Sequence, residues 1–174
     1  MNQPALNALC AAARTVTGAA AVSVAVVADE GLRYVASDGA GADEIVGTVL
    51  TSGRGLASFV AASGQSLAIG RVTSDPRFAQ DVAERTGYVP TAMLLIPVLD
   101  TDGDVGGVLS VLDRAPVAIG DADALAVAGR FADVATHLIA DVADDEAAGL
   151  AARVARLDGT ARAAIDAMLE ALER

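Results

Sequence analysis

Lysine and tryptophan are absent from this chain of 174 residues, and cysteine and histidine each occur once. Without lysine, the chain has neither the phosphate-binding lysine of a P-loop nor a group that forms Schiff bases. A single cysteine and a single histidine exclude CxxC chemistry, cysteine-based zinc clusters and multi-histidine metal sites. A Ser/His/Asp triad would depend on His137, which lies in a helical pattern well after the predicted strands. We therefore expect a protein that is not an enzyme and that carries no metal or cofactor.

Long hydrophobic runs are also missing, although 53% of the residues are apolar. No apolar run reaches the roughly 18 residues of a membrane-spanning helix, and residues 1–20 lack the charged start and apolar core of a signal peptide. The lone cysteine agrees with a reducing compartment, so we expect a cytoplasmic protein without a membrane partner. The net charge of −11 repels phosphate backbones, so nucleic acid is not an expected partner either.

Helices and short strands alternate along the first part of the chain, as the spacing of apolar residues indicates. Helices are expected over 4–17, from Gly55 to Gly64, from Ser74 to Gly87, and from Asp121 onward. Strands are expected over 21–28, 32–37, 67–69, 92–99 and 105–112. The run 92–99 is apolar almost throughout, which is typical of a strand buried on both faces. This order of elements favours an α+β fold, with an antiparallel sheet and helices on both faces.

The helical pattern continues from Asp121 to the end of the chain. A first apolar face is predicted at Leu125, Ala128, Phe131, Ala135, Leu138 and Val142. A second series has the spacing of a coiled-coil seam, at Leu150, Val154, Leu157, Ala161, Ile165, Met168 and Leu172. We therefore predict one domain over residues 1–142 and a C-terminal helical extension over 143–174.

Six short motifs follow one another in the centre of the chain. They are GRGLA at 53–57, SGQ at 63–65, DPRF at 75–78, GYVP at 87–90, IPV at 96–98 and the strand at 107–112. In their order and spacing they resemble the centre of a GAF domain, and the resemblance covers about residues 4–142. The resemblance implies a GAF/PAS-like antiparallel sheet and a domain that senses small molecules or dimerises more often than it catalyses.

The resemblance also implies a ligand pocket between the sheet and the short central helices. Its expected wall is Phe59, Ile69, Arg71, Phe78, Val82, Tyr88, Met93 and Leu95. The alternative is that these side chains only fill the core. Tyr88 differs from the others because a buried phenol needs a hydrogen-bond partner. Arg71 would either clamp an anionic ligand or lie in solvent at the end of a strand.

Specialised members of the family have features that this sequence lacks. The signature of cyclic-nucleotide-binding members is Asn-Lys, then Phe, then Asp-Glu, and the matching positions here are Asp113-Arg114, Ile119 and Asp123-Ala124. Methionine sulfoxide reductases of the family need several cysteines, whereas Cys10 stands alone on a predicted helix. Bilin- and haem-binding members need a suitably placed histidine, but His137 lies on the terminal helix. The identity of the ligand is therefore open.

Apolar stripes on the terminal helices suggest how such a domain would signal. The expected dimer interface comprises Leu6, Leu9, Leu138, Val142, Leu150, Val154 and Leu157. We expect a non-catalytic sensory or regulatory module that binds an unknown small molecule, forms a homodimer and signals through these helices to a partner protein. The alternative is a ligand-free dimerisation or protein-interaction scaffold. The last helix could also fold back on its own domain.

Overall fold

The structure, a computed structural model, describes residues 3–100, 102–115 and 121–154. Residues 2–140 form one compact unit, and the chain from Asp141 onward belongs to a second unit. Most of the predicted extension over 143–174, including the coiled-coil positions from Leu157 onward, lies outside the described residues. The fold described below is therefore that of the compact unit.

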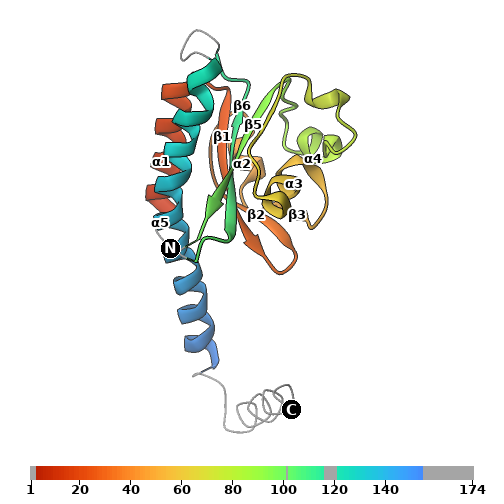
Figure 1. Ribbon diagram of the computed structural model, residues 1–174. Helices are drawn as coiled ribbons and strands as arrows, with labels where there is room; N and C mark the ends of the chain where they lie inside the picture. Colours follow the sequence, from red (N-terminus) through yellow and green to blue (C-terminus); the bar gives the residue numbers. More distant parts are fainter. Residues whose placement is uncertain (1–2, 101, 116–120, 155–174) are drawn as a thin grey trace. The chain divides into compact units, whose positions relative to one another are not determined.

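Six strands form one antiparallel sheet in the order β3-β2-β1-β6-β5-β4 (Figure 1). The strands are β1 (Ala21–Ala28), β2 (Gly31–Gly39), β3 (Val49–Thr51), β4 (Leu67–Ile69), β5 (Met93–Leu99) and β6 (Val105–Leu112). The two central strands, β1 and β6, come from opposite ends of the domain, and Val24 lies opposite Leu109. Strand β5 is buried on both of its faces, as its apolar sequence predicts. The α+β fold with an antiparallel sheet is thus confirmed.

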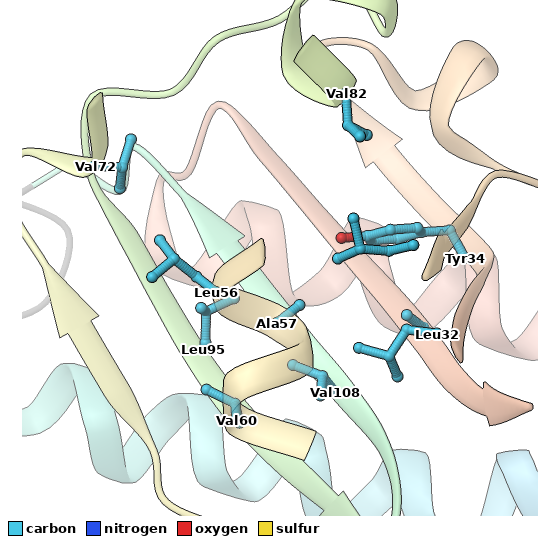
Figure 2. Packing of buried hydrophobic residues seen from close by; sticks show 11 residues of the cluster. Leu32, Tyr34, Leu56, Ala57, Val60, Val72, Val82, Leu95 and Val108 are labelled. Carbon is cyan, nitrogen blue, oxygen red and sulfur yellow. The ribbon is translucent and has the colours of Figure 1, made fainter. Parts of the chain in front are cut away.

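Helices cover both faces of this sheet (Figure 1). One face carries α1 (Gln3–Thr17) and the part of α5 (Asp121–Val154) that precedes Asp141. The other face carries the short elements α2 (Ala42–Ile45), α3 (Gly55–Ser63), the 3-10 turn η1 (Val72–Ser74) and α4 (Gln80–Arg85). The short helices and the sheet face beneath them share one hydrophobic core, which Figure 2 shows around α3.

A β-bulge changes which side chains of β2 face the short helices. Tyr34 pairs with Ala25 and Ala36 pairs with Val24, so Val35 is an extra residue without a partner of its own. Alternation along a regular strand would place Tyr34 and Ser37 on opposite faces of the sheet. The extra residue puts both on the face that α3 covers. The bulge therefore brings a phenol and a serine to the same side.

The first helix, α1, packs against the sheet with its apolar stripe. Leu6, Leu9, Cys10 and Ala13 are all buried within the domain. Leu6 and Leu9, which the sequence analysis places at a dimer interface, thus contact their own sheet in this structure. Burial raises the pKa of the Cys10 thiol from 9 to about 12, and the nearby Asp38 carboxylate adds to the shift.

The face of helix α5 that packs against the sheet differs from the one that its larger apolar residues predict. The buried positions are Ala124, Ala128, Ala132, Ala135 and Ile139, whereas Leu125 is 48% exposed. A stripe of alanines lets the helix approach the sheet closely. Gly106 shows this closeness, because a Cβ atom there would lie 3.2 Å from Cδ1 of Ile139. The predicted face was therefore wrong at Leu125, because four alanines and Ile139 are buried instead.

The predicted helix from Ser74 to Gly87 is shorter in the structure and begins at Gln80. Asp75 does not cap a helix. Its Oδ1 atom instead accepts a hydrogen bond of 2.9 Å from the backbone N–H of Arg77 and so holds a local turn. Pro76 follows this acceptor, and the chain does not become helical for several residues. Two further short elements, α2 and β3, have no clear sequence pattern because three or four residues carry too little periodicity.

Candidate functional site

A cavity of about 80 Å³ lies between the sheet and the short helices. Its wall is mostly apolar, with side chains from the sheet and from the α3 and α4 regions that include Leu50, Leu56, Phe78, Val82, Met93 and Leu112. None of the residues that line it is charged. The cavity is thus an apolar chamber in which a few polar groups can determine what binds.

Four of the eight residues expected in the pocket line this cavity: Phe78, Val82, Tyr88 and Met93. Phe78 and Val82 come from the loop before α4 and from α4 itself, whereas Met93 begins β5. Tyr88 lies in the loop between these two elements. The structure therefore brings together side chains from a continuous stretch of chain that folds over the sheet.

The other four residues lie elsewhere. Phe59 is 37% exposed, and the guanidinium of Arg77 lies 4.4 Å from the centre of its ring. Ile69 belongs to the edge strand β4 and borders a separate surface groove. Arg71 is exposed after that strand, as the solvent alternative predicts. Leu95 is fully buried in the core beside α3 (Figure 2).

Three serines in register form a polar row on the cavity floor, and sequence reasoning missed them. Ser23 of β1 lies between Ser37 of β2 and Ser110 of β6, and all three line the cavity. The Ser37 hydroxyl donates to the carbonyl of Val22 at 3.2 Å. Ser110 is only 2% exposed, and its Oγ atom has no hydrogen-bond partner among the described residues. The signal available in the sequence was a single serine within each apolar strand.

Tyr34 adds a phenol to the same chamber. Its side chain is buried, and desolvation raises its pKa from 10 to about 12. Figure 2 shows its ring extending from β2 over the sheet, with the hydroxyl at the inner end. Burial of a polar group is unfavourable unless the group forms a hydrogen bond. The serine row and this phenol therefore mark the polar part of the cavity.

The N-terminal end of α3 also opens onto the cavity. Gly55, Leu56 and Ala57 are buried and line it, and no side chain caps this end of the helix. The first amides of a helix have no partner within the helix. Gly55 has a φ of 80°, and a Cβ atom there would lie 2.9 Å from Cδ2 of Leu50. Glycine is thus required for the helix to begin so close to the wall.

Asp113 directly follows β6 and forms a hydrogen bond with Tyr88, which lines the cavity. Its carboxylate accepts a hydrogen bond from the Tyr88 hydroxyl. It also accepts bonds from the backbone N–H groups of Thr91 at 2.9 Å and Ala92 at 2.7 Å. Asp113 holds a φ of 48°, a conformation that aspartate adopts more readily than most residues. Desolvation, followed by this carboxylate, raises the pKa of Tyr88 to about 12.

Replacing Asp113 with Ala is expected to lower the free energy of unfolding by about 2 kcal/mol, because three donors lose a charged acceptor that is only partly exposed. Asp113→Asn is the matched control, since asparagine keeps an acceptor oxygen and tolerates the positive φ. Urea unfolding of both variants measures the difference. Equal losses in the two variants would contradict the role given to the acceptor.

Alkaline pH is expected to destabilise the domain, and Tyr34 is expected to contribute to this loss between about pH 10 and 12. The unfolded Tyr34 phenol loses its proton near pH 10, whereas the folded one keeps it to about 12. Stability from this group is thus present below pH 10 and falls by on the order of 2 kcal/mol by pH 12. Urea midpoints from pH 8 to 12 measure the decline. Tyr34→Phe should make it shallower, and an unchanged slope would count against this origin.

The comparisons with known proteins agree with this architecture. The sequence model of the GAF domain matches residues 2–139, so the chain belongs to the GAF domain family. GAF domains are regulatory domains that bind small molecules. Within the described residues, no group of three His, Cys, Asp or Glu side chains is placed to hold a metal ion. Nor does that part of the chain contain a helix of the length and hydrophobicity needed to cross a membrane.

One similar protein is the dual 3',5'-cyclic-AMP and -GMP phosphodiesterase 11 of Drosophila melanogaster, 39% identical over 62 residues. The match covers 36% of this chain and only 4% of the phosphodiesterase. The GAF domain of an Acinetobacter phosphoenolpyruvate-protein phosphotransferase has a similar structure, with 19% identity and a TM-score of 0.67 over 83% of this chain and 85% of that one.

A second similar structure is that of an enzyme, the type II free methionine-R-sulfoxide reductase from Thermoplasma acidophilum. It is 18% identical, with a TM-score of 0.61, and the match covers 80% of this chain and 92% of that one. At this level of identity the likeness concerns the fold alone. GAF domains are generally regulatory, and some proteins with this fold are enzymes.

Proposed function

We propose that this chain is a non-catalytic sensory or regulatory GAF module that binds a small molecule in the cavity over the serine row. The observation that carries the proposal is the buried hydroxyl of Ser110, which lies at the wall of a mostly apolar chamber and has no hydrogen-bond partner among the described residues. A hydroxyl in that position is stabilised when a ligand supplies the missing hydrogen bond. The missing partner supports binding there, rather than a fully filled core.

The route from the cavity to a partner protein would run through the two central strands. Ser23 and Ser110 belong to β1 and β6, the strands that lie next to each other in the centre of the sheet. Helix α1 ends at Thr17, shortly before β1 begins, and α5 is the next described element after β6. A ligand would change the helices only if it bound one arrangement of these strands better than another.

Native mass spectrometry of the purified protein tests the proposal. A small mass that is present on the folded protein and absent after denaturation is expected. A panel of small molecules, screened by thermal shift, covers a ligand lost in purification. The proposal fails if the protein carries no extra mass and no compound raises the melting temperature.

A dimerisation scaffold is the second candidate, and exposed apolar side chains on the terminal helices favour it. Val16 of α1 is half-exposed, and Leu125 and Val134 of α5 are 48% and 51% exposed. Leu138 is half-buried, while the side chains of Val142, Leu150 and Val154 lie outside those described. Analytical ultracentrifugation of the protein and of Val134→Asp tests this candidate. A monomer at micromolar concentration would exclude it.

A further inference from the structure

The cavity is small, and its size limits what can occupy it. Its volume of about 80 Å³ is roughly half that of a protein cavity that holds benzene, about 150 Å³. A molecule of a few non-hydrogen atoms fits this space. A nucleotide is much larger than this volume, so only a part of it would lie within the cavity.

The polar groups of the cavity call for a ligand that accepts hydrogen bonds. Backbone N–H groups at the uncapped end of α3 can only donate, and Leu56 and Ala57 place that end at the cavity. The Ser110 hydroxyl is buried, has no hydrogen-bond partner in the part of the chain that the structure describes, and borders the same space. Serine hydroxyls both donate and accept, so an oxygen acceptor satisfies every one of these groups.

The possible oxygen acceptors are either anionic or uncharged, and the surroundings of the cavity favour an uncharged one. An anion in the cavity would meet no cationic side chain, because none of the lining residues is charged. The end of a helix supplies the equivalent of about half an elementary positive charge, which does not neutralise a full negative one. Just outside the lining residues, the Asp113 carboxylate accepts a hydrogen bond from Tyr88, and a negative charge there would repel an anion in the cavity. The chain as a whole carries a net charge of −11, which further disfavours an anion.

We infer that the cavity selects a compact, uncharged oxygen acceptor, such as a small primary amide, whose carbonyl oxygen binds between Ser110 and the start of α3. This inference rests on the proposed function, since it specifies the ligand of the same cavity. The apolar part of the molecule packs against apolar residues of the wall such as Val82 and Met93.

Pairs of molecules of equal shape and different charge test the inference. Acetamide and propionamide are compared with acetate and propionate, each titrated to 100 mM into ¹⁵N-labelled protein at constant ionic strength. Saturable shifts at the amide signals of Ser23, Tyr34 and Ser110 report occupancy of the cavity. We expect the amides to bind at least tenfold more tightly than the carboxylates of the same size.

Ser110→Ala removes the unpartnered hydroxyl and little volume, so the variant is expected to fold. Its affinity for propionamide should fall about tenfold. Ser66→Ala, at an exposed serine outside the cavity wall, is the matched control and should bind as the original protein does.

The outcomes separate this inference from the proposed function. Tighter binding of the carboxylates would overturn the assignment of charge and leave the binding function intact. An unchanged affinity in Ser110→Ala would overturn the position of the acceptor. If neither class binds and native mass spectrometry finds a larger retained molecule, the inference fails and the proposed function stands. If that mass is also absent and the thermal screen is negative, both fail.

Discussion

Replacing Leu95 with Ala is expected to lower the free energy of unfolding by about 2–5 kcal/mol. The Leu95 side chain is 0% exposed, and it lies on β5 opposite Ser110 of β6. Figure 2 places it between the sheet and α3, beside Leu56 and Val60. A smaller side chain leaves a cavity that these neighbours fill only in part. Urea or guanidinium unfolding, with the midpoint and slope fitted together, measures the loss.

Leu99→Ala is the matched control, because it makes the same chemical change on the same strand. Leu99 is 44% exposed at the end of β5. Its loss is expected to be about 0.5 kcal/mol or less, as for most surface substitutions. Similar losses at the two positions would show that Leu95 is not packed as the structure describes.

Replacing Gly31 with Ala is expected to cost about 3 kcal/mol or more, from two effects that act together. Gly31 has a φ of 137°, which side-chain-bearing residues rarely adopt and which costs about 1–3 kcal/mol. A Cβ atom there would also lie 2.2 Å from the carbonyl oxygen of Leu50, which belongs to β3. Backbone of β2 or β3 must therefore move, at a further cost of about 1–3 kcal/mol. Thermal unfolding measures the sum.

Gly87→Ala separates the two effects. Gly87 also has a positive φ, 72°, but a Cβ atom there has no neighbour within 4 Å. Only the conformational cost of about 1–2 kcal/mol is expected at this position. A loss at Gly87 as large as that at Gly31 would mean that the close approach of β3 to β2 contributes nothing.

The sequence predicts the long elements of the fold because their apolar residues repeat with a clear period. Strand β1, for example, is short and rich in β-branched residues. The apolar runs of β5 and β6 are likewise separated by an acidic stretch that is typical of a turn. It does not predict the start of α4, since Asp75 and Pro76 satisfy the rules for a helix start while forming a turn. For α5, the rule that large apolar residues face the core is overridden by the close fit that alanine allows.

The candidate site is predictable only where its residues are neighbours in sequence. Phe78, Val82, Tyr88 and Met93 lie on one continuous segment that resembles a known motif. Ser23 and Ser110 meet only because β1 and β6 pair in a particular register. A bulge at Val35 then turns Tyr34 and Ser37 to the same face. Neither the register of β1 with β6 nor the bulge at Val35 can be predicted from a local sequence pattern. The polar floor of the cavity is therefore visible only in the three-dimensional fold.

The pairing of β1 with β6 has a consequence for how the chain is made. On the ribosome, β1 is synthesised with β2 and can form a hairpin with it at once, whereas Leu109, the partner of Val24, follows much later. Until then one edge of an apolar strand is open to other strands, and such edges are sites of aggregation. The nascent chain therefore passes through an interval in which a central strand of the sheet has an unpaired edge, and that interval ends only when β6 has left the exit tunnel.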